Sequence, residues 1–138
     1  MDGQFDVIVP VRVDLSGGWT DVNPYCTDFG GEVINFTINK YVKATVNILK
    51  EITYDFDIPI GSGLGTSGSV NVARIALLGK DQNLSLHEIA EAAYQEEIKS
   101  GNKCGRQDQW AATFGGFNRF MFHGENVEIM PFEPARSA

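Results

Sequence analysis

Apolar and polar residues alternate with a period of two along several stretches of the chain, which is the pattern of strands that bury one face. In the first stretch, Phe5–Leu15, every second residue from Val7 onward is Val or Leu. The same alternation predicts further strands at Val33–Ile38, Tyr41–Ile48, Ile52–Ile58, Phe117–Phe122 and Val127–Phe132. Asn39-Lys40 separates two of these strands and Gly124 separates two others, so we expect a hairpin at each place.

Three other stretches favour helices. An apolar run over Ser69–Leu78 is followed directly by a glycine, a residue common after helix C-termini. Ser85 and Glu88 form a capping box, which predicts a second helix that runs to about Ser100. A third, short helix is expected at Gln107–Phe114. About six strands and three helices in this order suit an α+β fold, a two-layer mixed sheet with helices on one face.

The run Pro59–Ser69 lies between a predicted strand and a predicted helix, and it contains four glycines and four hydroxyl residues. Glycines let successive backbone N–H groups converge, and a helix N-terminus adds positive potential, so the loop is suited to binding a phosphate. No Lys follows its second glycine as in a P-loop, and Thr66 stands where a Rossmann fingerprint needs its third glycine. The alternative is a turn that binds no ligand.

The composition is that of a single globular domain, with 138 residues, 43% hydrophobic and 21% charged. A net charge of −7 disfavours nucleic acid as a partner, because basic side chains must neutralise its phosphates. No apolar run is long enough for a membrane span, so no membrane partner is expected. The separated Cys26 and Cys104 favour a reducing compartment, and the first residues do not resemble a signal peptide. These features predict a cytoplasmic protein.

Two carboxylates, those of Glu97 and Asp108, are candidates for a chemical role. Glu97 continues the apolar stripe of the second predicted helix, whereas Glu96 lies off that stripe, toward solvent. The stripe comprises Leu86, Ile89, Ala90 and Ala93. A buried carboxylate is costly without a cation, so Glu97 either binds a metal or pairs with an Arg, unless the helix end rolls outward. Asp108 lies near the start of the third helix, where an acidic side chain interacts favourably with the helix dipole and needs no further role.

Three motifs follow one another along the chain. They are PVRVDLSGGWTD at Pro10–Asp21, PIGSGLGTS at Pro59–Ser67, and GRQDQ at Gly105–Gln109 followed by FGGF at Phe114–Phe117. In this order they resemble the GHMP kinases, the family of galactokinase, homoserine kinase, mevalonate kinase and phosphomevalonate kinase. The first and third are similar to a sugar 1-kinase branch that includes L-fucokinase and D-glycero-D-manno-heptose 7-phosphate kinase. The resemblance implies the ribosomal protein S5 domain 2-like fold, with residues 1–138 as the N-terminal, ATP-binding domain.

The resemblance also implies how ATP and Mg²⁺ would be held. The ATP phosphates would lie against the second motif, at Gly61, Ser62, Gly63, Leu64, Gly65, Thr66 and Ser67. Ser67 and Glu97 would hold Mg²⁺, an ion that prefers hard oxygen ligands and keeps several waters. Glu97 stands eleven residues before Asp108, at the spacing of the metal-binding glutamate in mevalonate kinase-like chains.

By the same resemblance, Asp108 and Arg12 would be the catalytic residues, and Asp108 would accept the proton of the sugar hydroxyl or hold its oxygen in line. Arg12 would lie near the transferred phosphate and steady its charge. Asp21 would hold the hydroxyl groups of a small-molecule sugar or sugar phosphate, with Gly18 and Trp19 beside it. Trp19 has packing in the core as its alternative role.

Family members also carry a C-terminal domain and a helical segment that helps to build the nucleotide pocket. Neither is found here, and only a few residues join Lys50 to the strand before Pro59. We therefore expect little or no turnover from this chain alone, and self-association through uncovered apolar surface. The competing hypothesis is a non-catalytic domain that keeps the fold and binds nucleotide weakly at most. A nucleic-acid-binding domain is a third hypothesis, which the net charge of −7 argues against.

Overall fold

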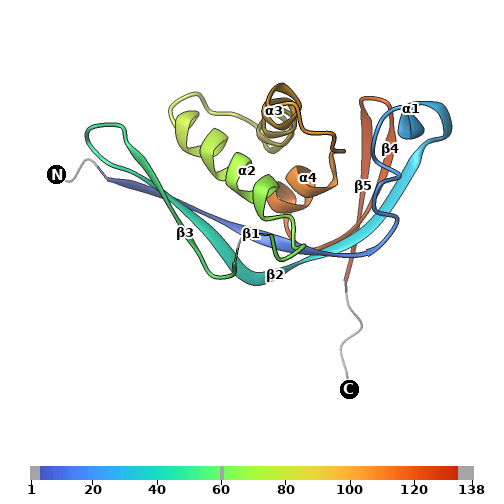
Figure 1. Ribbon diagram of the computed structural model, residues 1–138, viewed down its shortest axis with the longest axis horizontal. Coiled ribbons are helices and arrows are strands. Elements are labelled where there is room, and N and C mark those ends of the chain that lie inside the picture. Colours follow the sequence, from blue (N-terminus) through green and yellow to red (C-terminus); the bar gives the residue numbers. More distant parts are fainter. Residues whose placement is uncertain (1–3, 60, 134–138) are drawn as a thin grey trace, which may run out of the picture.

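The computed structural model describes residues 4–59 and 61–133, so Ile60 of the glycine-rich run lies outside the described residues. One five-stranded sheet carries the three longer helices on one face (Figure 1). The strands are β1 (Phe5–Ser16), β2 (Gly31–Val46), β3 (Ile52–Phe56), β4 (Phe117–His123) and β5 (Asn126–Phe132). The helices are α1 (Tyr25–Phe29), α2 (Thr66–Leu78), α3 (Leu86–Lys99) and α4 (Gln107–Phe114). The predicted α+β architecture is confirmed.

All strand pairs among the described residues are antiparallel, so the sheet is not mixed as the sequence suggested. One edge of β2 pairs with β1, and its other edge pairs with β3 over Val42–Val46 and with β4 over Gly31–Phe36. β3 and β4 run in the same direction but border opposite ends of β2. They therefore never pair with each other, and no parallel ladder forms.

The hairpin predicted at Asn39-Lys40 is wrong, because both residues belong to the single long strand β2. β1 and β2 stay paired on both sides of this point, but Val11 of β1 faces three residues of β2, Ile38–Lys40. The polar pair therefore marks a bulge, which bends a strand without reversing it. A tight hairpin turn favours residues that adopt positive φ, such as Asn-Gly, and lysine does not favour that conformation.

The predicted helices are present, with one change of boundary. α3 begins with the predicted capping box, in which Ser85 Oγ accepts the N–H of Glu88 and the Glu88 carboxylate accepts the N–H of Ser85. α4 has the predicted bounds, and α1 was not predicted. α2 begins at Thr66 rather than at Ser69, because Gly65, with φ of 70°, acts as its N-cap. The end of the glycine-rich run thus forms the first turn of α2.

The core lies between the sheet and the helices, in two clusters. One contains Val9, Ala44, Val72, Ala73, Leu77, Ala93 and Ala112, and the other contains Cys26, Val33, Ala90, Trp110, Ala111, Phe120 and Phe122. The predicted inward face of β1 holds at Val9 and Val11, but Leu15 is exposed because the register of the strand shifts there. Among residues 4–59 and 61–133, no helix combines the length and apolar character needed to cross a membrane.

Candidate active site

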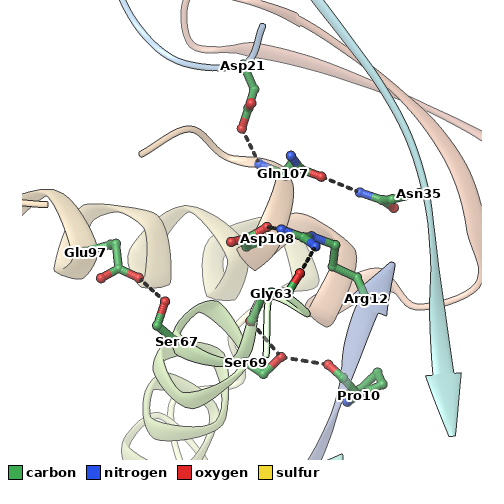
Figure 2. A network of polar contacts seen from close by, with 11 residues as sticks. Pro10, Arg12, Asp21, Asn35, Gly63, Ser67, Ser69, Glu97, Gln107 and Asp108 are labelled. Carbon is green, nitrogen blue, oxygen red and sulfur yellow. Dashed lines mark hydrogen bonds and ion pairs between the residues drawn. The ribbon is translucent and has the colours of Figure 1, made fainter. Parts of the chain in front are cut away.

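The glycine-rich loop Gly61–Gly65 leads into α2 and is held against β1 (Figure 2). Its three glycines have φ of 85°, 81° and 70°, a conformation that residues with side chains rarely adopt. The backbone N–H of Arg12 donates to the carbonyl of Leu64 at 3.0 Å, and Arg12 Nη1 donates to the carbonyl of Gly63 at 3.1 Å. No side chain caps the first turn of α2. Its N–H groups and positive end are therefore available to an anion.

The hydroxyl groups of this region have different surroundings. Ser62 and Ser67 are exposed. Thr66 is buried, and its Oγ1 has no hydrogen-bond partner among the described residues. Ser69 Oγ donates to the carbonyl of Pro10 at 2.8 Å, which ties α2 to β1. Ser62 and Ser67 are therefore the hydroxyl groups that a ligand can reach from solvent.

Glu97 is buried on α3, with 6% of its surface exposed, as predicted. Ser67 Oγ and Asn71 Nδ2 each donate to its Oε1 at 3.2 Å, and Asn102 Nδ2 donates to its Oε2 at 2.7 Å. Among the described residues no Lys, Arg or His forms an ion pair with it, so the alternative of a salt bridge to Arg is not found. A buried carboxylate held only by neutral donors lacks a cation to offset its charge.

Ser67 and Glu97 thus bring a hydroxyl and a carboxylate together at the first turn of α2 (Figure 2). Both are hard oxygen ligands of the kind that Mg²⁺ prefers. The described part of the chain contains no group of three or more His, Cys, Asp or Glu side chains placed to hold a metal. This pair fits an ion that takes the rest of its ligands from phosphate and water.

Arg12 and Asp108 form an ion pair beside the loop (Figure 2). Nε and Nη2 of Arg12 both contact Oδ1 of Asp108, at 2.8 Å and 2.7 Å, and the two side chains are 12% and 28% exposed. No described group donates a hydrogen bond to Oδ2, which leaves that oxygen available to a ligand. A Cβ built on Gly68 would lie 2.7 Å from Cβ of Asp108, so a glycine in α2 permits this close approach.

A cavity of about 270 Å³ borders the same ion pair. Its walls come from the loop after β1 (Gly18–Val22) and the loop before α4 (Lys103–Gly105), together with Arg12 and Asp108. No residue of the glycine-rich loop lines it. Arg12 and Asp108 line the cavity, and they also contact the glycine-rich loop and α2. The ion pair therefore lies between the cavity and the glycine-rich loop.

The predicted sugar-binding residues lie in this cavity. Asp21 is 5% exposed, and its Oδ2 accepts the backbone N–H of Gln107 at 3.1 Å. Burial raises the pKa of Asp21 above its ordinary value. Gly105 leaves room for it, because a Cβ there would collide with the Asp21 carboxylate. Gly18 leaves room for the carboxylate of Asp14 in the same way.

Trp19 is 72% exposed at the edge of the cavity, with φ of 78°. Its predicted alternative role, packing in the core, is therefore wrong. Trp110, by contrast, is buried in the core.

Sequence reasoning missed several polar residues that line this cavity or lie behind its wall. Gln107 Oε1 accepts from Asn35 Nδ2 at 3.3 Å, and Asn35 is fully buried on β2 (Figure 2). Asp14 pairs with Asn35 across the two strands, and the Oδ1 of each is buried without a partner among the described residues. The available signal was a polar residue at an inward position of an apolar strand. Lys103 carried no such signal, because its place in the cavity depends on tertiary structure.

Cys104 also lines the cavity but is not a reactive thiol. Burial raises its pKa to about 11, and the nearby carboxylates of Glu97, Asp108 and Asp21 add to the effect. The thiol is therefore protonated at neutral pH, which disfavours a role as a nucleophile.

Comparison with known families identifies the class of this fold. The model of the GHMP kinases N terminal domain matches residues 33–116, and the chain belongs to this family. A D-glycero-alpha-D-manno-heptose 7-phosphate kinase from Campylobacter jejuni is 32% identical over 174 residues, which cover 88% of this chain and 51% of the relative. An L-fucokinase/L-fucose-1-P guanylyltransferase from Bacteroides fragilis is 38% identical over 53 residues, 38% of this chain and 6% of the relative.

Solved structures agree with this assignment. A D-glycero-D-manno-heptose 1-phosphate kinase from Bacteroides thetaiotaomicron superposes with a TM-score of 0.79 at 27% identity, over 93% of this chain and 60% of that one. The galactokinase of Lactococcus lactis, with a TM-score of 0.70 at 18% identity over 94% of this chain and 47% of that one, shares the fold. The chain spans about half the length of the heptose 7-phosphate kinase, and their alignment of 174 residues is longer than the chain itself. That relative therefore has residues with no counterpart here.

Proposed function

We propose that the chain is the N-terminal, ATP-binding domain of a kinase that transfers the γ-phosphate of ATP to a hydroxyl of a sugar or sugar phosphate. The observation that carries this proposal is the position of the Arg12–Asp108 pair between the glycine-rich loop and the cavity. Phosphoryl transfer needs a donor site and an acceptor site that meet at one point. The relatives named above act on sugars and sugar phosphates, and this supports an acceptor of that class.

On the donor side, the chain would bind the triphosphate with backbone N–H groups of Gly61–Ser67 and the N-terminus of α2. Ser67 and Glu97 would hold Mg²⁺, which supplies neutralisation of the phosphate charge when bound. The exposed Ser67 hydroxyl can reach both a phosphate and the ion, while Glu97 is fixed by Asn71 and Asn102.

On the acceptor side, Asp21 would accept hydrogen bonds from sugar hydroxyls, with Trp19 and Gly18 beside it. Asp108 has Oδ1 occupied by Arg12 and Oδ2 available, so Oδ2 would take the proton of the reacting hydroxyl or hold its oxygen in line. Arg12 would orient this carboxylate and stabilise the negative charge on the transferred phosphate. Its hydrogen bond to the Gly63 carbonyl links the acceptor side to the loop. We place this chemistry in the cytoplasm, which the two free cysteines favour.

Calorimetric titration with ATP, with and without Mg²⁺, tests the proposal on this chain. We expect binding that depends on Mg²⁺ in the wild type and that weakens at least tenfold in Glu97→Gln, because the ion loses a carboxylate ligand. Glu96→Gln is the matched control: it removes the same charge one residue away, where Glu96 pairs with Arg74, and should bind as the wild type does. Loss of the same size in both variants, or no Mg²⁺ dependence, would contradict the assignment.

The alternative is a domain that keeps the fold without catalysis. The same titration separates the two, because such a domain would bind ATP weakly and without a contribution from Glu97. The unusual burial of Glu97 without a cation favours the kinase.

A further inference from the structure

A second cavity adjoins the one beside Asp108. It measures about 210 Å³, shares Trp19, Val22 and Lys103 with the first cavity, and extends to Tyr25. Together the two form a groove that leads from the Asp108 carboxylate past Trp19 and Lys103. A ligand in this groove can extend beyond a single sugar ring.

Charge is divided unequally along the groove. Its inner end carries the carboxylates of Asp14, Asp21 and Asp108, of which Asp108 is the one that forms an ion pair among the described residues. Arg12 is already engaged by that pair. Lys103, where the two cavities meet, is exposed and makes no hydrogen bond or ion pair with any residue in the described ranges 4–59 and 61–133. An anionic group is therefore repelled from the inner end and attracted to Lys103.

Trp19 supplies an independent indication of a ligand at this point. Its backbone φ of 78° lies in the left-handed region, which is costly for a bulky aromatic residue, and its side chain is 72% exposed. Strain of this kind persists at ligand-binding sites, where the surrounding structure enforces it. The exposed indole lines the same two cavities as Lys103 and offers a flat apolar face against which a sugar ring can stack.

We propose that Lys103 makes this groove selective for a sugar that already carries a phosphate. The reacting hydroxyl lies at Asp108, the ring stacks on Trp19, and the existing phosphate binds the Lys103 ammonium group. A neutral sugar would leave Lys103 without a partner. The inference rests on the proposed kinase function for the reaction, but it concerns the acceptor alone and is tested without nucleotide.

Calorimetry with mannose 6-phosphate, mannose and inorganic phosphate as probes tests the inference. We expect the wild type to bind mannose 6-phosphate about ten- to hundredfold more tightly than mannose, the range of a charge-assisted hydrogen bond. Lys103→Gln should reduce this preference to about threefold or less and leave mannose binding unchanged. Lys40→Gln removes the same charge from an exposed site on the β2 bulge and should keep the preference. Trp19→Ala should weaken both sugars by a similar factor.

Equal affinity for the two sugars, or a preference that survives Lys103→Gln, would overturn the inference. Inorganic phosphate that binds as tightly as mannose 6-phosphate would also overturn it, because the site would then recognise a bare anion. Absence of binding by either sugar rejects the groove as an acceptor site. The kinase proposal is tested separately, by the measurement of Mg²⁺-dependent ATP binding.

Discussion

The ion pair between Arg12 and Asp108 should contribute more to stability than an ordinary surface pair. Nε and Nη2 of Arg12 contact one carboxylate oxygen at 2.7–2.8 Å, and the arginine side chain is only 12% exposed. Hydrogen bonds to charged groups contribute about 1.5–3 kcal/mol, whereas exposed ion pairs contribute about 0–1 kcal/mol. Because Asp108 is 28% exposed and therefore partly screened, we expect a coupling near the lower bound, about 1.5–2 kcal/mol.

A double-mutant cycle measures this coupling. Arg12→Met keeps the length of the side chain, Asp108→Ala keeps the Cβ that packs on Gly68, and the double variant closes the cycle. The contact of Arg12 with the Gly63 carbonyl is lost in both variants that lack the arginine, so it cancels. Urea unfolding followed by tryptophan fluorescence gives each free energy, with Trp110 as the buried reporter.

The pair Arg74–Glu96 is the control. It joins α2 to α3 at 3.3 Å, with side chains 39% and 34% exposed, and the same cycle should give about 0–1 kcal/mol. If the coupling of Arg12 with Asp108 is no larger than that of this control, the ion pair does not hold Asp108 in place. The assigned orientation of its Oδ2 toward the acceptor would then lose its support.

Three further variants test the fold around the site. Burial raises the pKa of Asp21, so stability falls as the pH rises through the folded pKa and the buried carboxyl becomes charged. Asp21→Asn removes this charge and should raise the melting temperature at neutral pH. Calorimetry should show this gain in melting temperature shrinking as the pH falls toward 3.8. A gain independent of pH would contradict this sign. Gly105→Ala would place a Cβ against the Asp21 carboxylate and should cost about 1–3 kcal/mol in urea unfolding, whereas an unchanged midpoint would show that the loop yields freely. Ser85→Ala removes the cap of α3 and should cost about 1 kcal/mol by the same measurement, and no loss would mean that the capping box with Glu88 is not formed in solution.

Local chemistry explains which elements could be predicted from the sequence. The capping box at Ser85 and Glu88 fixes the start of α3, and the alternation on either side of Gly124 fixes the β4–β5 hairpin. The helix α1 was missed because its signal is a side-chain contact: Asn23 Oδ1 accepts from Thr27 Oγ1 at 2.6 Å. The strand β2 was divided in two because a bulge and a turn place similar polar residues in an apolar pattern.

The residues of the candidate site also differ in whether the sequence alone could reveal them. Glu97 could be found from the sequence, because the helical periodicity places it on the apolar stripe of α3, the face that is buried. Asn35 could have been found, as a polar residue at an inward position of an apolar strand. Gln107 and Lys103 could not, since their places in the cavity depend on how the start of α4 and the loop before it pack against the loop after β1. The apposition of Arg12 and Asp108, which are 96 residues apart, likewise depends on how α4 packs against β1.

We propose above all that the glycine-rich loop, the Ser67–Glu97 pair and Asp108 form one site for a triphosphate and its metal ion. Paramagnetic relaxation by Mn²⁺·ATP, a substitute for Mg²⁺·ATP, tests it most directly in ¹H–¹⁵N spectra of the chain. We predict strong broadening of the amides of Gly61–Ser67, Glu97 and Asp108, reversed by excess Mg²⁺, with much weaker effects on β5, which pairs with β4. Broadening centred elsewhere, or none at millimolar Mn²⁺·ATP, would contradict the account.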